Sequence, residues 1–183
     1  MGGNARTSGG VGTVAGGIEK IDTVNFANNG NAADFGDLTV GRRNPTSNVN
    51  NTIRGVIIGG VGPGSPGVSN VMDYITMGTT GNATDFGDST SARASCMGAA
   101  SPTRGINAGG SAPSVSNLIE FITIATTGNA TDFGDLQAAE TFCGGVSSTT
   151  RGVITGGNDG SSADATTHLI TLATLGNATN FGE

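Results

Sequence analysis

Four residues at matching places in a repeated sequence could form a site for acid–base or metal chemistry: Asp22, Asp73, Glu120 and His168. Carboxylates and an imidazole act as general acids and bases and also bind zinc. If the repeats are arranged in a circle, these positions converge on the axis or line one rim. Alternatively, each carboxylate accepts hydrogen bonds from a neighbouring backbone or arginine and holds adjacent repeats together. We favour this structural interpretation and predict no catalytic residue, no metal and no cofactor.

Acidic residues also recur as a pair in the phrase D-F-G-D. The pairs are Asp34 with Asp37, Asp85 with Asp88, and Asp132 with Asp135. Oxygen-rich turns can bind calcium, but this phrase lacks the spaced acids and final glutamate of an EF-hand loop. Hydrogen bonds from Asp to its own turn explain the phrase more simply.

Three arginines each precede a glycine at the start of a short apolar run: Arg54, Arg104 and Arg151. They could bind an anionic ligand, but their repetition favours pairing with the acids of an adjacent repeat. Nucleophile–base pairs and CxxC spacing are missing, and the glycine clusters lack the lysine of a phosphate-binding loop. The sequence therefore predicts a protein that is not an enzyme.

All these residues belong to an internal repeat. The phrase GNATDFGD and its variants place Phe35, Phe86, Phe133 and Phe181 at separations of 51, 47 and 48 residues. A second marker runs in phase with the phenylalanines, as the doublets Gly16-Gly17, Gly59-Gly60, Gly109-Gly110 and Gly156-Gly157. Two markers with one period indicate four tandem copies of one structural unit.

Each unit offers four short strand candidates. An apolar run ends at the glycine doublet, where the backbone needs unusual φ values. The segments VMDYITM and LIEFITI are rich in β-branched and aromatic residues, which is typical of strands. GNATDFGD has the composition of a tight turn whose phenylalanine packs into the core. With 33 glycines among 183 residues, long helices are improbable and an all-β fold is expected.

These features resemble kelch repeats. The resemblance rests on VIIGG, on an acid beside an aromatic at Asp73-Tyr74 and Glu120-Phe121, on the later Phe86 and Phe133, and on Ala92-Arg93. The sequence departs from the kelch pattern at the second aromatic, which is phenylalanine where the family usually has tryptophan. It departs again at the alanine-arginine pair, which is Arg42-Arg43 in the first unit and Ala139-Glu140 in the third. The resemblance implies a β-propeller, a ring in which each unit is one four-stranded blade.

The ends of the sequence suggest how such a ring closes. Residues 1–17 roughly match 143–157, so they could complete the last unit, which stops at Glu183. We therefore expect a single four-bladed domain with 1–17 as the closing segment and repeat units at 18–54, 55–104, 105–151 and 152–183. Two chains forming one larger propeller, and a fragment of a longer repeat protein, are the alternatives.

Charge and cysteine content limit the partners. The net charge is −6 with one lysine and seven arginines, which argues against nucleic acid as a partner. The sequence has no apolar stretch near twenty residues, so we expect no membrane insertion. Cys96 and Cys143 are one repeat apart and are expected to be small buried apolar residues, with a disulfide between them as the minority alternative.

The sequence varies most in the segment after each glycine doublet, at 18–20, 61–70, 111–117 and 158–166. Divergent loops on one face of a rigid scaffold are typical of a binding module. The expected binding residues are Ser65, Ser69, Asn70, Ser114, Asn117, Asn158 and Asp159.

The phrase TTGNATDFGD also looks like repeats in tail and other virion structural proteins of marine bacteriophages. We therefore expect a non-enzymatic structural or recognition module of a virion, outside the cell. Its expected partners are other virion proteins or a host glycan or protein, and a homo-oligomer is compatible with this role. The alternative is a small propeller enzyme acting on glycans with Asp22, Asp73, Glu120 and His168.

Overall fold

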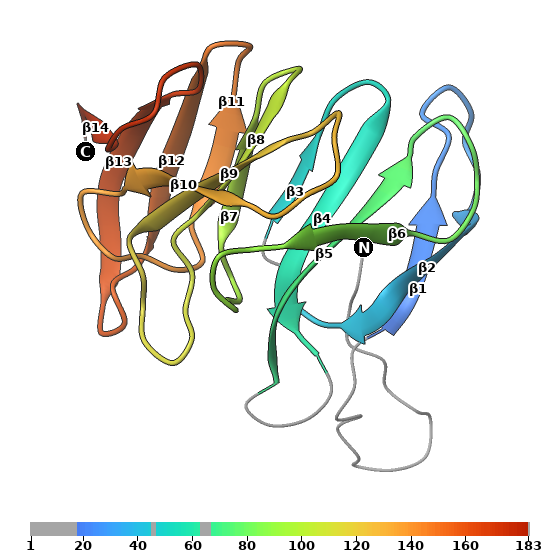
Figure 1. The fold of residues 1–183 in the computed structure, drawn as a ribbon, viewed down its shortest axis with the longest axis horizontal. Coiled ribbons are helices and arrows are strands. Elements are labelled where there is room, and N and C mark those ends of the chain that lie inside the picture. Colours follow the sequence, from blue (N-terminus) through green and yellow to red (C-terminus); the bar gives the residue numbers. More distant parts are fainter. Residues whose placement is uncertain (1–17, 45–46, 63–66, 183) are drawn as a thin grey trace.

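The computed structural model describes residues 18–44, 47–62 and 67–182, and all regular structure in these ranges is β-strand. The prediction of an all-β fold is confirmed. The sheets lie side by side in chain order, from the first, in blue, to the last, in red (Figure 1). None of the described residues forms a helix suited to crossing a membrane.

Three of the sheets contain four strands each, as predicted for one repeat unit. Every strand pairs with its sequence neighbours in antiparallel register, so each sheet is a simple meander. The second sheet contains β3 (Ser47–Asn50), β4 (Arg54–Val61), β5 (Val68–Thr76) and β6 (Thr84–Asp88). The third contains β7 (Met97–Ala100), β8 (Arg104–Ala108), β9 (Leu118–Thr123) and β10 (Thr131–Asp135). The fourth contains β11 (Gly144–Ser147), β12 (Arg151–Asn158), β13 (Ala163–Thr171) and β14 (Thr179–Gly182).

The first sheet contains two strands within the described residues, β1 (Ile18–Thr23) and β2 (Ala33–Arg42). They correspond to the last two strands of the other sheets. Residues 18–20, expected in a variable loop, lie instead in β1. The predicted closing segment, residues 1–17, lies outside the described residues.

The sheets are out of phase with the sequence repeat units. In each full sheet the first strand precedes the arginine that opens the unit, and it pairs with the strand that begins at that arginine. For example, β7 pairs with β8, which starts at Arg104. The boundaries of the sequence repeat units and of the sheets differ by one strand. Each repeat unit therefore contributes strands to two neighbouring sheets.

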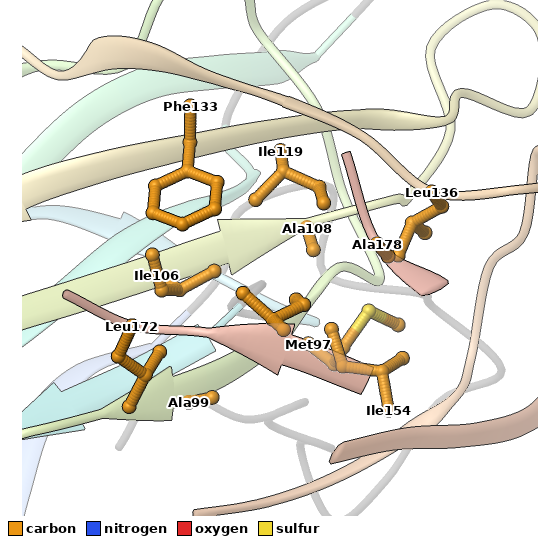
Figure 2. Close-up of a cluster of buried hydrophobic side chains, with 11 residues drawn as sticks. Met97, Ala99, Ile106, Ala108, Ile119, Phe133, Leu136, Ile154, Leu172 and Ala178 are labelled. Atoms are coloured by element: carbon orange, nitrogen blue, oxygen red, sulfur yellow. The ribbon is translucent and has the colours of Figure 1, made fainter. Parts of the chain in front are cut away.

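The hydrophobic core is divided among the spaces between sheets. Figure 2 shows the cluster between the third and fourth sheets, in which Ile106 and Phe133 of one sheet lie with Ile154 of the other. A second cluster joins Val49 and Phe86 to Ile122 and Ile124 across the second and third sheets. A smaller cluster around Phe35 joins the first and second sheets. Each sheet is therefore stabilised by covering the apolar face of its neighbour.

The phrase GNATDFGD is not the predicted tight turn. Its TDFGD part forms the last strand of a sheet, and its groups bind the preceding sheet. At one junction Gly128 donates its N–H to the Phe86 carbonyl at 2.7 Å, and Ala130 donates to Asp88 at 2.8 Å. The Asn129 Oδ1 atom accepts from the Asp88 N–H at 3.0 Å. The repeated glycine, asparagine and alanine thus connect neighbouring sheets.

The same three hydrogen bonds recur at the other two junctions. The bonds from the first to the second sheet are Gly81 N to Phe35 O, Ala83 N to Asp37 O, and Asp37 N to Asn82 Oδ1. The bonds from the third to the fourth are Gly176 N to Phe133 O, Ala178 N to Asp135 O, and Asp135 N to Asn177 Oδ1. Expected Asx-type bonds are also present, because Asp85 Oδ1 accepts from Gly87 N at 3.0 Å.

Candidate recognition surface and buried charge pairs

Asp73 lies buried in the middle of β5 and pairs with a cation from the preceding repeat. Its carboxylate accepts from the Arg42 guanidinium and, at 2.5 Å, from the Thr39 hydroxyl. Arg42 also donates to the Val71 carbonyl at 3.1 Å. Burial lowers the pKa of Arg42, and the Asp73 carboxylate opposes that effect. This pair joins the end of β2, in the first sheet, to the centre of the second sheet.

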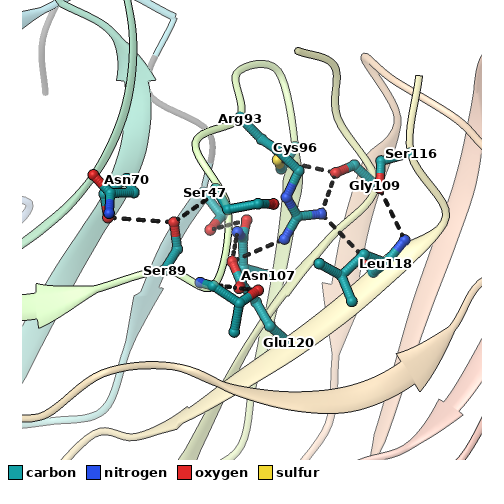
Figure 3. Close-up of polar contacts among 12 residues, drawn as sticks. Ser47, Asn70, Ser89, Arg93, Cys96, Asn107, Gly109, Ser116, Leu118 and Glu120 are labelled. Atoms are coloured by element: carbon teal, nitrogen blue, oxygen red, sulfur yellow. Dashed lines mark hydrogen bonds and ion pairs between the residues drawn. The ribbon is translucent and has the colours of Figure 1, made fainter. Parts of the chain in front are cut away.

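Glu120 takes the same place in β9 and is held by a larger network (Figure 3). Arg93 Nη2 lies 2.8 Å from Glu120 Oε1, and Asn107 Nδ2 donates to the same oxygen at 2.6 Å. The other oxygen accepts from the N–H and the hydroxyl of Thr90, at 2.8 and 2.5 Å. The carboxylate therefore has a polar partner on each oxygen in a fully buried position.

His168 occupies the equivalent position in β13, where the pair is inverted. Its Nε2 atom lies 3.0 Å from Glu140 Oε1, so the acid is on the connection and the base on the strand. The Gln137 N–H points at Nδ1 from 3.4 Å. Because Nδ1 accepts, the proton of a neutral ring is on Nε2 and is donated to Glu140.

The structure thus brings each of Asp73, Glu120 and His168 to its own partner. The described residues contain no group of three or more His, Cys, Asp or Glu side chains placed to bind a metal ion. Asp22 differs from its counterparts, because it is exposed in β1. The partners Arg42, Arg93 and Glu140 were not recognised as such from the sequence. The signal was available, because the acid becomes His168 in the unit that follows the one in which the arginine becomes Glu140.

Arg54 and Arg104 connect sheets in a different way from the one expected. Each guanidinium lies over an aromatic ring of its own sheet, at 4.3 Å from the Tyr74 centroid and 4.5 Å from the Phe121 centroid. Each donates to a backbone carbonyl of the following sheet, Ile124 O at 3.0 Å and Leu172 O at 2.6 Å. The expectation that they pair with acids is wrong, because rings and carbonyls take that role.

Both cysteines are free, and Cys96 is buried as expected, while Cys143 is half-buried. Burial raises the pKa of Cys96 to about 12. Burial also raises the pKa of Cys143, whose thiol donates to Glu140 Oε2 at 3.2 Å. Cys143 thereby supplies a second donor to the buried Glu140 carboxylate.

The predicted binding residues are partly in loops. Ser114 and Asn117 are exposed in the β8–β9 connection, and Asp159 is exposed in the β12–β13 connection. Asn158 ends β12 and is half-buried, and Ser65 lies outside the described residues. Ser69 and Asn70 are half-buried in β5 rather than in a loop.

The β8–β9 and β12–β13 connections emerge on the same side of the array, at the lower edge of Figure 1. They also approach each other directly, since a Cβ atom on Gly160 would lie 2.9 Å from Val115 Cγ2. We refer to residues 111–117 and 158–162, among which Ser114, Asn117 and Asp159 are exposed, as the loop face. This surface combines hydroxyl, amide and carboxylate groups.

Asp159 organises its loop. Its Oδ1 atom accepts from the N–H groups of Ser161 and Ser162, both at 2.7 Å, and from the Ser161 hydroxyl at 2.8 Å. These hydrogen bonds to the ionised form lower the pKa of Asp159 to about 2. The loop is thus pre-organised at neutral pH by a carboxylate that remains on the surface.

We expect Asp159 to titrate far below an ordinary aspartate in carbon-detected NMR of the side-chain carboxyl. Because the folded pKa is depressed from 3.8 to about 2, the stabilisation is present above pH 3.8 and is lost as the pH falls through 2. The amide shifts of Ser161 and Ser162 should follow the same curve. An apparent pKa near 4 for Asp159 would show that the loop is not held by its carboxylate.

Comparison with known proteins supports the fold. No protein-family model and no curated protein sequence matches the chain. The solved structure of YjhT is similar, with a TM-score of 0.65 at 16% sequence identity over 79% of this chain. The chain spans about half of that protein, covering 46% of it. At this identity the similarity concerns the arrangement of the strands.

Proposed function

We propose that the chain is a segment of a kelch-like β-propeller that acts as a non-enzymatic recognition or structural module. Its three full sheets follow one another as blades do, and each is joined to the next by the same contacts. The repeated arginines, acids and glycines are used in those contacts. The observation that carries the proposal is that the variable connections β8–β9 and β12–β13 share one side of this repeated framework.

The partner we propose is a virion protein or a glycan of a bacterial surface, with the protein located in a virion outside the cell. The support for this setting is the likeness of TTGNATDFGD to virion repeats together with the hydroxyl and amide groups of the loop face. Serine, asparagine and aspartate side chains can form hydrogen bonds with sugar hydroxyls. Charge does not favour nucleic acid, since the net charge is −6.

The enzyme alternative has less support from the geometry. Glu120 and His168 are fully buried and hydrogen-bonded within the framework, so a substrate does not reach them in this structure. Replacing them would report on folding rather than on a reaction. The loop face is therefore the surface to test.

The test measures binding of the full chain to immobilised bacterial lipopolysaccharide, capsular polysaccharide and teichoic acid by biolayer interferometry. The triple variant Ser114→Ala, Asn117→Ala, Asp159→Ala should lose at least tenfold in affinity for whichever glycan binds. The control Ile53→Glu changes an exposed residue in the turn between β3 and β4 and should bind normally.

Mass spectrometry of purified phage particles tests the proposed location. Peptides of this chain in washed particles, at a fixed ratio to a major structural protein, support a virion component. Equal glycan binding by the triple variant and the wild type would contradict the loop face as the binding site. Absence of the chain from particles, together with no glycan binding, would contradict the proposed function as a whole.

A further inference from the structure

The last sheet ends the array with an apolar face that is covered in every preceding full sheet. Val146 in β11 is 66% exposed, whereas its counterparts Val49 and Ala99 are 1% and 3% exposed. Phe181 in β14 is 58% exposed, whereas Phe86 and Phe133 are 2% and 3% exposed. The counterparts are covered by the following sheet. The last sheet therefore exposes the apolar face that, in the other full sheets, is covered by the following sheet.

The first sheet presents the other half of such an interface between sheets. Val24 and Phe26 follow β1 and are 52% and 100% exposed. Their counterparts in the third repeat, Ile122 and Ile124, are buried against the preceding sheet in the cluster around Val49 and Phe86. The first sheet therefore has the apolar pair that a preceding sheet would cover.

Polar groups at the two ends also match. Gly30, Asn31 and Ala32 correspond to the glycine, asparagine and alanine that bind the preceding sheet elsewhere, and all three are exposed. Arg151, exposed in β12, corresponds to Arg54 and Arg104. Those two arginines donate to the carbonyls of Ile124 and Leu172, and the corresponding group on the first sheet is the Phe26 carbonyl. The last sheet therefore has the arginine donor, and the first sheet has the carbonyl acceptor, of the hydrogen bond that joins neighbouring sheets elsewhere.

We propose that the last sheet of one chain binds the first sheet of a second copy, head to tail, through the same contacts that join its own sheets. The first and last sheets of one chain lie at opposite ends of the array, so these two sheets do not meet within a single copy in this structure (Figure 1). A head-to-tail contact forms a ring when its rotation closes and a filament when it does not. We favour a ring of two copies, because one chain covers 46% of the similar YjhT structure.

The first experiment measures the mass of the full chain by light scattering over a range of concentrations. We expect a shift from 17.9 kDa to twice that value as the concentration rises. Phe26→Glu and Val146→Glu each place a charge on one end and should each abolish the shift. Both side chains are exposed in the single chain, so circular dichroism should show that both variants remain folded. Ile53→Glu, an exposed apolar residue at neither end, should associate like the wild type.

Mixing the two variants gives the decisive result. Phe26→Glu retains an intact last sheet and Val146→Glu retains an intact first sheet, so an equimolar mixture should form a complex of two chains. A contact between two like ends would instead leave one of the variants able to associate alone. Wild-type protein with the mass of one chain at all concentrations would overturn the proposal. The loop-face variant should associate normally, so this test and the glycan test can fail independently.

Discussion

Arg93→Ala is expected to lower the free energy of unfolding by about 3–5 kcal/mol. The substitution removes the cation from Glu120, which is fully buried and 2.8 Å from Arg93 Nη2. It also removes the hydrogen bonds that Arg93 Nη1 donates to the carbonyls of Gly109 and Leu118, at 2.6 and 3.0 Å. A buried carboxylate without its counter-ion is among the most destabilising single defects.

The measurement is urea unfolding followed by circular dichroism, and the charge contribution is isolated by a second substitution. Glu120→Gln keeps the shape of the side chain but removes its charge. The double variant Arg93→Ala, Glu120→Gln should therefore be more stable than Arg93→Ala alone. Arg151→Ala, which changes an exposed arginine, should stay within about 0.5 kcal/mol of the wild type when the protein is monomeric. If the double variant is no more stable than Arg93→Ala, the loss comes from the lost packing and not from the unpaired charge.

The repeat and the strand content could be predicted from the sequence because both depend on local patterns. Apolar runs that end in glycine doublets form β4 and β12, and the doublets adopt the expected positive φ, as at Gly59 (56°) and Gly156 (61°). Three of the four repeat phenylalanines are buried as predicted. Phe181 is the exception, and its exposure follows from its place in the terminal sheet rather than from its own sequence.

The use of GNATDFGD could not be predicted from local chemistry. Asparagine, aspartate and glycine favour turns because their side chains bond nearby backbone groups and glycine accepts positive φ. Here Asn82 accepts from Asp37, 45 residues away, and Asn129 accepts from Asp88, 41 residues away. Composition alone does not distinguish a residue that bonds its own turn from one that bonds the neighbouring sheet.

The buried charge pairs could be predicted only in part, because the sequence indicates one member of each pair and not its partner. Asp73 and Glu120 stand out in the sequence as repeated acids, but their partners lie 31 and 27 residues earlier, at the end of β2 and in the connection between β6 and β7. Only the arrangement of sheets brings the two positions together. In the last of these pairs both members change, to Glu140 in the third unit and His168 in the fourth, so the two partners vary together within one chain.

Gly87→Ala is expected to be the most informative test of the contact between sheets, because it adds a single methyl group. Gly87 has φ of +134°, which residues with a Cβ atom rarely adopt. Its Cβ would lie 2.6 Å from the Gly128 carbonyl oxygen of the next sheet. That carbonyl cannot move freely, because the Gly128 N–H donates to the Phe86 carbonyl at 2.7 Å. We expect a loss of about 3 kcal/mol in the free energy of unfolding, from backbone strain and steric overlap together.

The matched control is Gly182→Ala in the last sheet, where the same position has φ of +140° but nothing within 4 Å of the added Cβ. This variant has the backbone strain without the overlap, so its loss should be about 1 kcal/mol. Urea unfolding is measured at a concentration where light scattering gives the mass of a single chain. The difference between the two variants then measures the close approach of neighbouring sheets, because their backbone conformations are alike. Equal losses in the two variants would mean that the repeated glycine serves its own strand, and that neighbouring sheets do not require it to approach so closely.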